Sequence, residues 1–142
     1  MNTYFEDIFA VFLSKITTFS EYTALTEEEL NMELTMLMKT AIAKFINKQN
    51  LIPNYDMEYF NRTLDDLEIE ILAYGMVVSW LTPKINNIEL LKQSLSSKDF
   101  NFYSQANHLK ELRELKADAE KEFQYWIGRY NLNRLSKAGF QQ

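Results

Sequence analysis

The chain has 142 residues, of which 46% are hydrophobic, and this fits one compact domain with a packed core and excludes a wholly disordered chain. Its 3 glycines and 2 prolines are too few for a many-stranded barrel or sandwich, and the absence of cysteine excludes disulfide frameworks, thiolate metal sites and cysteine nucleophiles. The net charge of −5 argues against nucleic-acid binding, because that function needs clustered lysine and arginine.

The first predicted helix begins at Thr3, whose hydroxyl can cap free backbone N–H groups while Glu6 completes a capping box. Apolar side chains then recur at spacings of three and four, the pattern of one buried helix face. They are Phe5, Ile8, Phe9, Phe12, Ile16 and Phe19. Residues 20–24 are expected to connect this helix to the next.

The strongest helix start is Thr26, which forms a second capping box with Glu29. We predict one helix over residues 26–48, about 35 Å long at 1.5 Å per residue. Its buried face holds Leu30, Leu34, Leu37, Ala41 and Phe45. Met32 and Met36 lie off that face, and because methionine adapts its shape to a partner, both are candidates for a subunit contact.

Residues 49–62 lack helical periodicity, and Pro53 cannot continue a helix. Tyr55, Tyr59 and Phe60 nevertheless supply bulky aromatic side chains. We therefore predict a long connection that is packed by its own aromatic side chains or by those of a partner.

A buried central helix is predicted over about residues 65–82. Asp65 and Glu68 offer another capping box, and the following side chains are apolar around nearly the whole circumference, which is typical of a helix enclosed on all sides. Gly75 costs about 1 kcal/mol relative to alanine inside a helix, and close approach of a neighbouring helix would compensate for it. Pro83 is expected to end or kink this helix.

Two further helices are predicted in the C-terminal half. Asn87 can cap a short one, and Ser104 can cap a long one over about residues 104–130. The loop between them exposes three aromatic side chains, those of Phe100, Phe102 and Tyr103. Residues 131–142 contain basic side chains and no acid, and we expect them to be extended, or frayed until a partner orders them.

These elements predict an all-α fold, a bundle of four to five helices with a buried central helix. Residues 1–130 form a single helical domain, and residues 131–142 form a C-terminal docking tail. The acidic N-terminus is unlike a secretory signal, and the longest apolar stretch, Ile69–Leu81, is shorter than a membrane span. We expect a protein made in the cytoplasm, without a membrane partner.

No set of residues predicts catalysis, a cofactor or a metal site. The densest carboxylate cluster lies at a helix start, where the helix dipole alone favours acids, and consists of Asp65, Asp66, Glu68 and Glu70. His108 and Glu111 lie one turn apart, but their order is the reverse of the di-iron motif and there is no second such pair. No glycine-rich loop can hold a phosphate. We therefore expect a protein that is not an enzyme.

The charge is unevenly distributed along the chain. Residues 1–70 hold 13 acidic and 5 basic side chains, whereas residues 71–142 hold 7 acidic and 10 basic ones. One interpretation is an uneven but solvated surface. Another is that an acidic face and a basic end meet on neighbouring copies, because complementary potentials steer association and set its register.

The interface candidates are adaptable or aromatic side chains and the basic, apolar end of the chain: Met32, Met36, Phe100, Phe102, Tyr103, Arg134, Leu135, Lys137 and Phe140. For the aromatic loop at residues 96–103, packing back under the last helix is an equal alternative.

Three segments look like parts of small structural proteins of tailed bacteriophages that infect Gram-positive hosts. These segments are Gly75–Ile85, Ser97–Phe100 and Tyr103–Leu112. The order of the predicted helices over residues 26–130 also resembles that of head–tail connector (adaptor) proteins. The long aromatic connection at residues 49–62 departs from the family pattern.

The resemblance implies a non-enzymatic virion protein of the neck. In that family, identical subunits form a ring, commonly of twelve, under the portal protein and next to the following neck or tail protein. The ring frames a channel through which DNA passes without sequence-specific binding, and residues 131–142 would be the docking arm. Two alternatives stay open: another phage structural component, such as a tail completion or baseplate protein, and a soluble helical adaptor that binds a host protein.

Overall fold

The computed structural model describes residues 1–16, 22, 24–45, 51–94 and 102–140, and the side chains of residues 1–16, 22, 24–45, 51–89 and 107–135 within them. The described helices are α1 (Phe5–Lys15), α3 (Glu27–Lys44), α4 (Asp66–Ser94) and α5 (Phe102–Phe140). The described residues also form a two-stranded antiparallel sheet of β1 (Pro53–Asn54) and β2 (Tyr59–Phe60). The predicted all-α fold is therefore confirmed.

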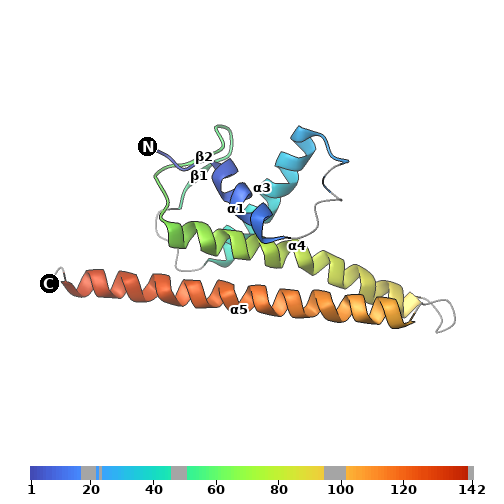
Figure 1. Ribbon diagram of the computed structural model, residues 1–142. Helices are drawn as coiled ribbons and strands as arrows, with labels where there is room; N and C mark the ends of the chain where they lie inside the picture. The colour runs from blue at the N-terminus through green and yellow to red at the C-terminus, as the bar shows by residue number, and fades with distance from the viewer. Residues whose placement is uncertain (17–21, 23, 46–50, 95–101, 141–142) are drawn as a thin grey trace.

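The central helix of the fold is α4. It packs against α1, α3 and α5, with α1 and α3 on one side and the antiparallel α5 on the other (Figure 1). The buried apolar side chains along α4 are Ile71, Leu72, Ala73, Met76, Val77, Val78, Leu81 and Ile85. The prediction of a central helix enclosed by its neighbours is confirmed.

Gly75 lies where three helices meet. A Cβ atom at this position would stand 2.7 Å from the Ala41 Cβ of α3 and 3.0 Å from the Phe123 Cε2 of α5. Real Cβ atoms almost never approach that closely, so glycine is required for this packing distance. The predicted close approach of a neighbouring helix is confirmed.

The helix starts predicted at Thr26 and Asp65 are both confirmed. The Glu29 N–H donates to the Thr26 hydroxyl at 3.1 Å, and the Thr26 N–H donates to the Glu29 carboxylate at 3.3 Å. In the same way the Glu68 N–H donates to the Asp65 carboxylate at 2.8 Å, and the Asp65 N–H donates to Glu68 at 3.0 Å. Both boxes are local patterns, and neither depends on a distant partner.

The cap predicted at Thr3 is wrong by one residue. The N-cap of α1 is Tyr4, whose N–H donates to the Asp7 carboxylate at 3.2 Å. Thr3 is buried, and its hydroxyl accepts a hydrogen bond from the Leu64 N–H at 2.8 Å instead. Its carbonyl accepts from the Phe60 N–H at 2.9 Å, and an isolated antiparallel bridge joins the next residue, Tyr4, to Tyr59 of β2.

The connection at residues 51–62 is packed by aromatic side chains, as predicted. Phe60 is fully buried, and its ring centroid lies 5.2 Å from that of Phe5 in α1. The sheet within this connection was not predicted, because strands of two residues carry no alternation of apolar and polar positions.

Of the two outcomes predicted at Pro83, a helix end is wrong, because α4 continues through Pro83 to Ser94, and a kink stays a prediction. Proline removes one backbone donor, but the helix beyond it stays packed, since Ile85 is buried in the core. An ion pair between Glu89 of α4 and Arg113 of α5 joins the two helices further on. The separate short helix predicted from Asn87 is therefore part of α4.

The last helix is longer at both ends than the predicted residues 104–130. It begins at Phe102, so Phe102 and Tyr103 are helical rather than part of a loop, and Ser104 is not its cap. It also continues to Phe140, so the tail expected to be extended is helical. No proline interrupts residues 131–140, so nothing in their backbone chemistry ends the helix before them.

Candidate functional site

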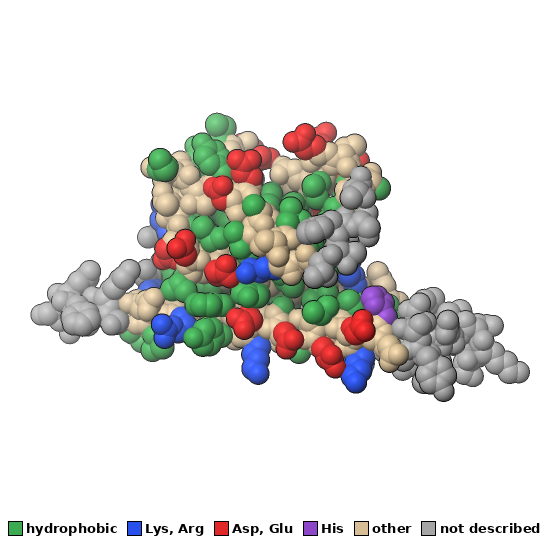
Figure 2. Space-filling model, in the orientation of Figure 1, with side chains coloured by type: hydrophobic (Ala, Val, Ile, Leu, Met, Phe, Trp, Pro, Cys, Tyr) green, Lys and Arg blue, Asp and Glu red, His purple; other side chains and the backbone are tan. Residues whose placement is uncertain are grey.

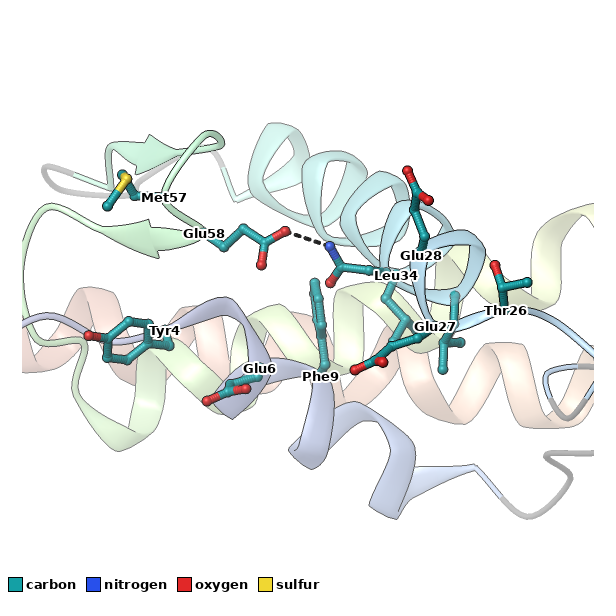
Figure 3. A pocket seen from close by; sticks show the side chains of 11 residues that line it. Tyr4, Glu6, Phe9, Thr26, Glu27, Glu28, Leu34, Met57 and Glu58 are labelled. Atoms are coloured by element: carbon teal, nitrogen blue, oxygen red, sulfur yellow. Dashed lines mark hydrogen bonds between the residues drawn. The ribbon is translucent and has the colours of Figure 1, made fainter.

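A groove lies between α1, the N-terminal half of α3 and the turn that joins β1 to β2 (Figure 3). Its volume is about 940 Å³. The lining side chains come from three separate stretches of sequence: residues 4–9, 26–34 and 57–58. We call this surface the acidic groove.

The acidic groove has an apolar floor and a negative rim. Phe9 and Leu34 form buried parts of the floor. The rim carries four exposed carboxylates, those of Glu6, Glu27, Glu28 and Glu58. No lysine or arginine is among the side chains that line it. The groove is thus suited to a basic, partly apolar ligand.

Glu58 holds the rim in place. Its φ of 60° is in the left-handed region, which a non-glycine residue adopts at a cost. The carbonyl of Glu58 accepts from the Phe5 N–H at 2.9 Å, and its N–H donates to the Asn54 carbonyl at 2.8 Å. Its carboxylate accepts from the Asn31 amide at 2.6 Å, so one residue ties the turn to both α1 and α3 (Figure 3).

The second surface is the C-terminal end of α5. Among the described side chains of this helix, Tyr130 is the last buried one, and its hydroxyl donates to Glu68 in the first turn of α4 at 3.3 Å. Residues 131–140 therefore extend past the start of α4, by about 15 Å at 1.5 Å per residue (Figure 1). We call residues 131–140 the overhang.

The overhang continues an exposed apolar stripe on α5. Tyr125, Leu132 and Leu135 are all exposed, and Leu135 retains 69% of its accessible surface. With Gly128, which has no atom within 4 Å of a built Cβ, these positions follow the 3–4–3 spacing of one helix face. Hydrophobic and basic side chains gather near this end of α5 in Figure 2. The stripe faces away from α4.

The carboxylate cluster predicted to be structural does not converge on one point. Glu68 is buried and pairs with Arg62, whereas Glu70 forms a salt bridge with Lys15 at 2.8 Å. Burial alone raises the pKa of Glu68, but the hydrogen bonds from Arg62 and from the Asp65 N–H outweigh it, and the pKa lies below its ordinary value. The Glu68 carboxylate is thus a charged group of the core.

His108 and Glu111 line a second hollow, of about 450 Å³, between α1, α4 and α5. Asp118 and Glu122 lie further along the same wall. Among the described residues, no three histidine, aspartate or glutamate side chains are placed to share a metal ion. No described helix is both long enough and apolar enough to cross a membrane.

The predicted interface residues fall into three groups. Met32, Met36 and Leu135 are exposed, the two methionines at 63% and 65%, and Arg134 is half-buried. Phe100 lies outside the described residues. The backbones of the remaining four lie in α5, and their side chains lie outside the described ones: Phe102, Tyr103, Lys137 and Phe140.

Sequence reasoning missed the acidic groove as a site. Its rim comes from residues 6, 27, 28 and 58, which no local motif connects. The available signal was the acidic excess of residues 1–70. We find no match to this chain among protein-family models, among curated protein sequences or among solved structures.

Proposed function

We propose that this chain is a structural virion protein, a head–tail connector subunit that assembles with copies of itself into a ring. The observation that carries the proposal is the overhang, a helix end that extends past the start of α4 with Leu132 and Leu135 exposed. Short isolated helices are only marginally stable in water, so such an extension is best explained by a protein partner that covers it.

The placement in a phage neck rests on the resemblance of Gly75–Ile85 and Tyr103–Leu112 to connector proteins. In this proposal the ring lies between a portal protein and the next neck or tail protein, inside the virion. The acidic excess of residues 1–70 supports a channel role, because an acidic wall lets DNA pass without holding it.

A non-enzymatic role is supported by the contacts of the carboxylates that sequence reasoning considered. Glu68 is engaged by Arg62 and Tyr130, and Glu70 is engaged by Lys15. These groups stabilise the fold by ion pairing and hydrogen bonding, which leaves them poorly suited to exchange protons with a substrate.

The test is antibody labelling of purified phage particles, read by electron microscopy. The proposal predicts label at the junction of head and tail. Label at the tail tip would replace it with the baseplate or tail completion alternative. Particles without label, together with a host protein retained by the purified chain, would replace it with the adaptor alternative.

A further inference from the structure

We infer that the acidic groove of one copy binds the overhang of a second copy. This inference deepens the proposed function, on which it rests for the ring, by naming the two surfaces that join neighbouring subunits. It commits to a homotypic, head-to-tail contact between the groove on α1 and α3 and the C-terminal end of α5.

The charges of the two surfaces are complementary. The groove rim carries four carboxylates and no basic side chain. The last acidic residue of the sequence is Glu122, and the residues after it include Arg129, Arg134 and Lys137. A basic helix end approaching this rim gains Coulomb attraction.

The apolar parts also correspond. The floor of the groove contains Phe9 and Leu34, with the exposed Met57 at its edge. The overhang presents Leu132 and Leu135, three residues apart and therefore on neighbouring positions of one helix face. An amphipathic helix whose apolar face enters a hydrophobic groove is a common mode of protein recognition.

The overhang of the same chain cannot reach its own groove in this fold. The groove lies among α1, α3 and the β1–β2 turn, whereas α5 lies on the opposite side of α4 (Figure 1). The overhang continues α5 as an unbroken helix and leads past the start of α4. A second copy can supply it, and a contact between two different surfaces repeats from copy to copy and closes into a ring when the rotation between neighbouring copies closes.

Charge reversal tests this contact. The groove variant E6K/E28K replaces one first-turn acid in each of α1 and α3. Its matched control, E33K/D66K, makes the same change in charge at exposed positions outside the groove, one of them also in a first helical turn. The overhang variant is R134E/K137E. Circular dichroism checks that each variant is folded.

The readout is the assembly state of each purified chain by analytical ultracentrifugation. We expect the wild-type chain and E33K/D66K to assemble, and E6K/E28K and R134E/K137E each to associate at least about tenfold more weakly. A mixture of the groove and overhang variants should assemble again, because the two new lysines of one variant's groove then meet the two new glutamates of the other variant's overhang, and the unchanged groove meets an unchanged overhang.

A monomeric wild-type chain, wild-type assembly by E6K/E28K, or a folded mixture that stays monomeric would each overturn the inference. These outcomes are separable from the proposed function. Rescue by the mixture with no label on phage particles would retain the contact and reject the connector role. Label at the neck together with normal assembly by E6K/E28K would retain the connector role and reject the contact.

Discussion

Glu68 is a charged side chain that the fold buries almost completely, with 2% of its surface exposed. Its carboxylate accepts hydrogen bonds from Arg62, from the Tyr130 hydroxyl and from the Asp65 N–H. It therefore joins the connection before α4, the first turn of α4 and the end of the α5 core. A buried carboxylate is tolerated only while such partners are present.

Removing the partner of Glu68 should destabilise the protein strongly. We expect Arg62→Met to lower the free energy of unfolding by about 3 kcal/mol, because it leaves a buried carboxylate without its cation. The double variant R62M/E68M should recover part of that loss, because it removes the unpaired buried charge, while the Asp65 N–H and the Tyr130 hydroxyl lose their acceptor. Urea denaturation measures both, and a loss no larger than that of a surface substitution would contradict this role.

The lowered pKa of Glu68 predicts acid sensitivity. The folded pKa lies below the ordinary value of 4.5, so the contribution of this ion pair is complete above that value and is lost as pH falls through the folded pKa. Stability should therefore fall more steeply with acid in the wild-type chain than in R62M/E68M. Denaturation midpoints at about pH 7 and about pH 3 check this, and equal slopes for the two proteins would contradict it.

At the scale of helices, packing distance decides what each position tolerates. We expect Gly75→Ala to destabilise the protein by about 1–3 kcal/mol, despite a gain of about 1 kcal/mol in helix propensity. The reason is that the new Cβ would stand 2.7 Å from Ala41, which is short and cannot move aside without shifting α3.

Gly128 supplies the control for this prediction, since nothing lies within 4 Å of a Cβ built on it. Gly128→Ala should raise stability by up to about 1 kcal/mol through helix propensity alone. Thermal unfolding of the two variants side by side gives the comparison. If both substitutions changed stability in the same direction, close helix packing at Gly75 would not be the explanation.

Helix starts were predictable where the determining contacts are local. Thr26 and Asp65 form boxes with residues three positions further on, so sequence alone located them. The cap predicted at Thr3 was wrong because its hydroxyl accepts a hydrogen bond from the N–H of Leu64, 61 positions away. The helix end predicted at Pro83 was wrong because the packing of the following turns outweighs the one hydrogen bond that proline removes.

At the scale of the whole molecule, the predicted architecture was right and the candidate site was found only in part. Periodicity placed the two exposed methionines off the buried face, whereas the exposed Leu135 was chosen from the composition of the chain end. The groove was not, because Glu6, Glu28 and Glu58 come together only when α1, α3 and the β1–β2 turn are assembled. Sequence reasoning detected their charge but not their common location.

Deleting residues 131–142 should separate folding from assembly. No described side chain after Tyr130 is buried, so the shortened chain should keep the helical structure of its core and change little in melting temperature. It should no longer assemble, because it lacks the helix end that enters the groove of the next copy. Circular dichroism and light scattering measure the two properties, and assembly that persists after the deletion would count against the docking role.

The most direct measurement is the copy number of this chain in purified phage particles, obtained by quantitative mass spectrometry against the portal protein. A connector ring predicts a fixed, small number of copies per particle, close to that of the portal subunit. Particles that lack the chain, or that carry it in variable amounts, would contradict the account.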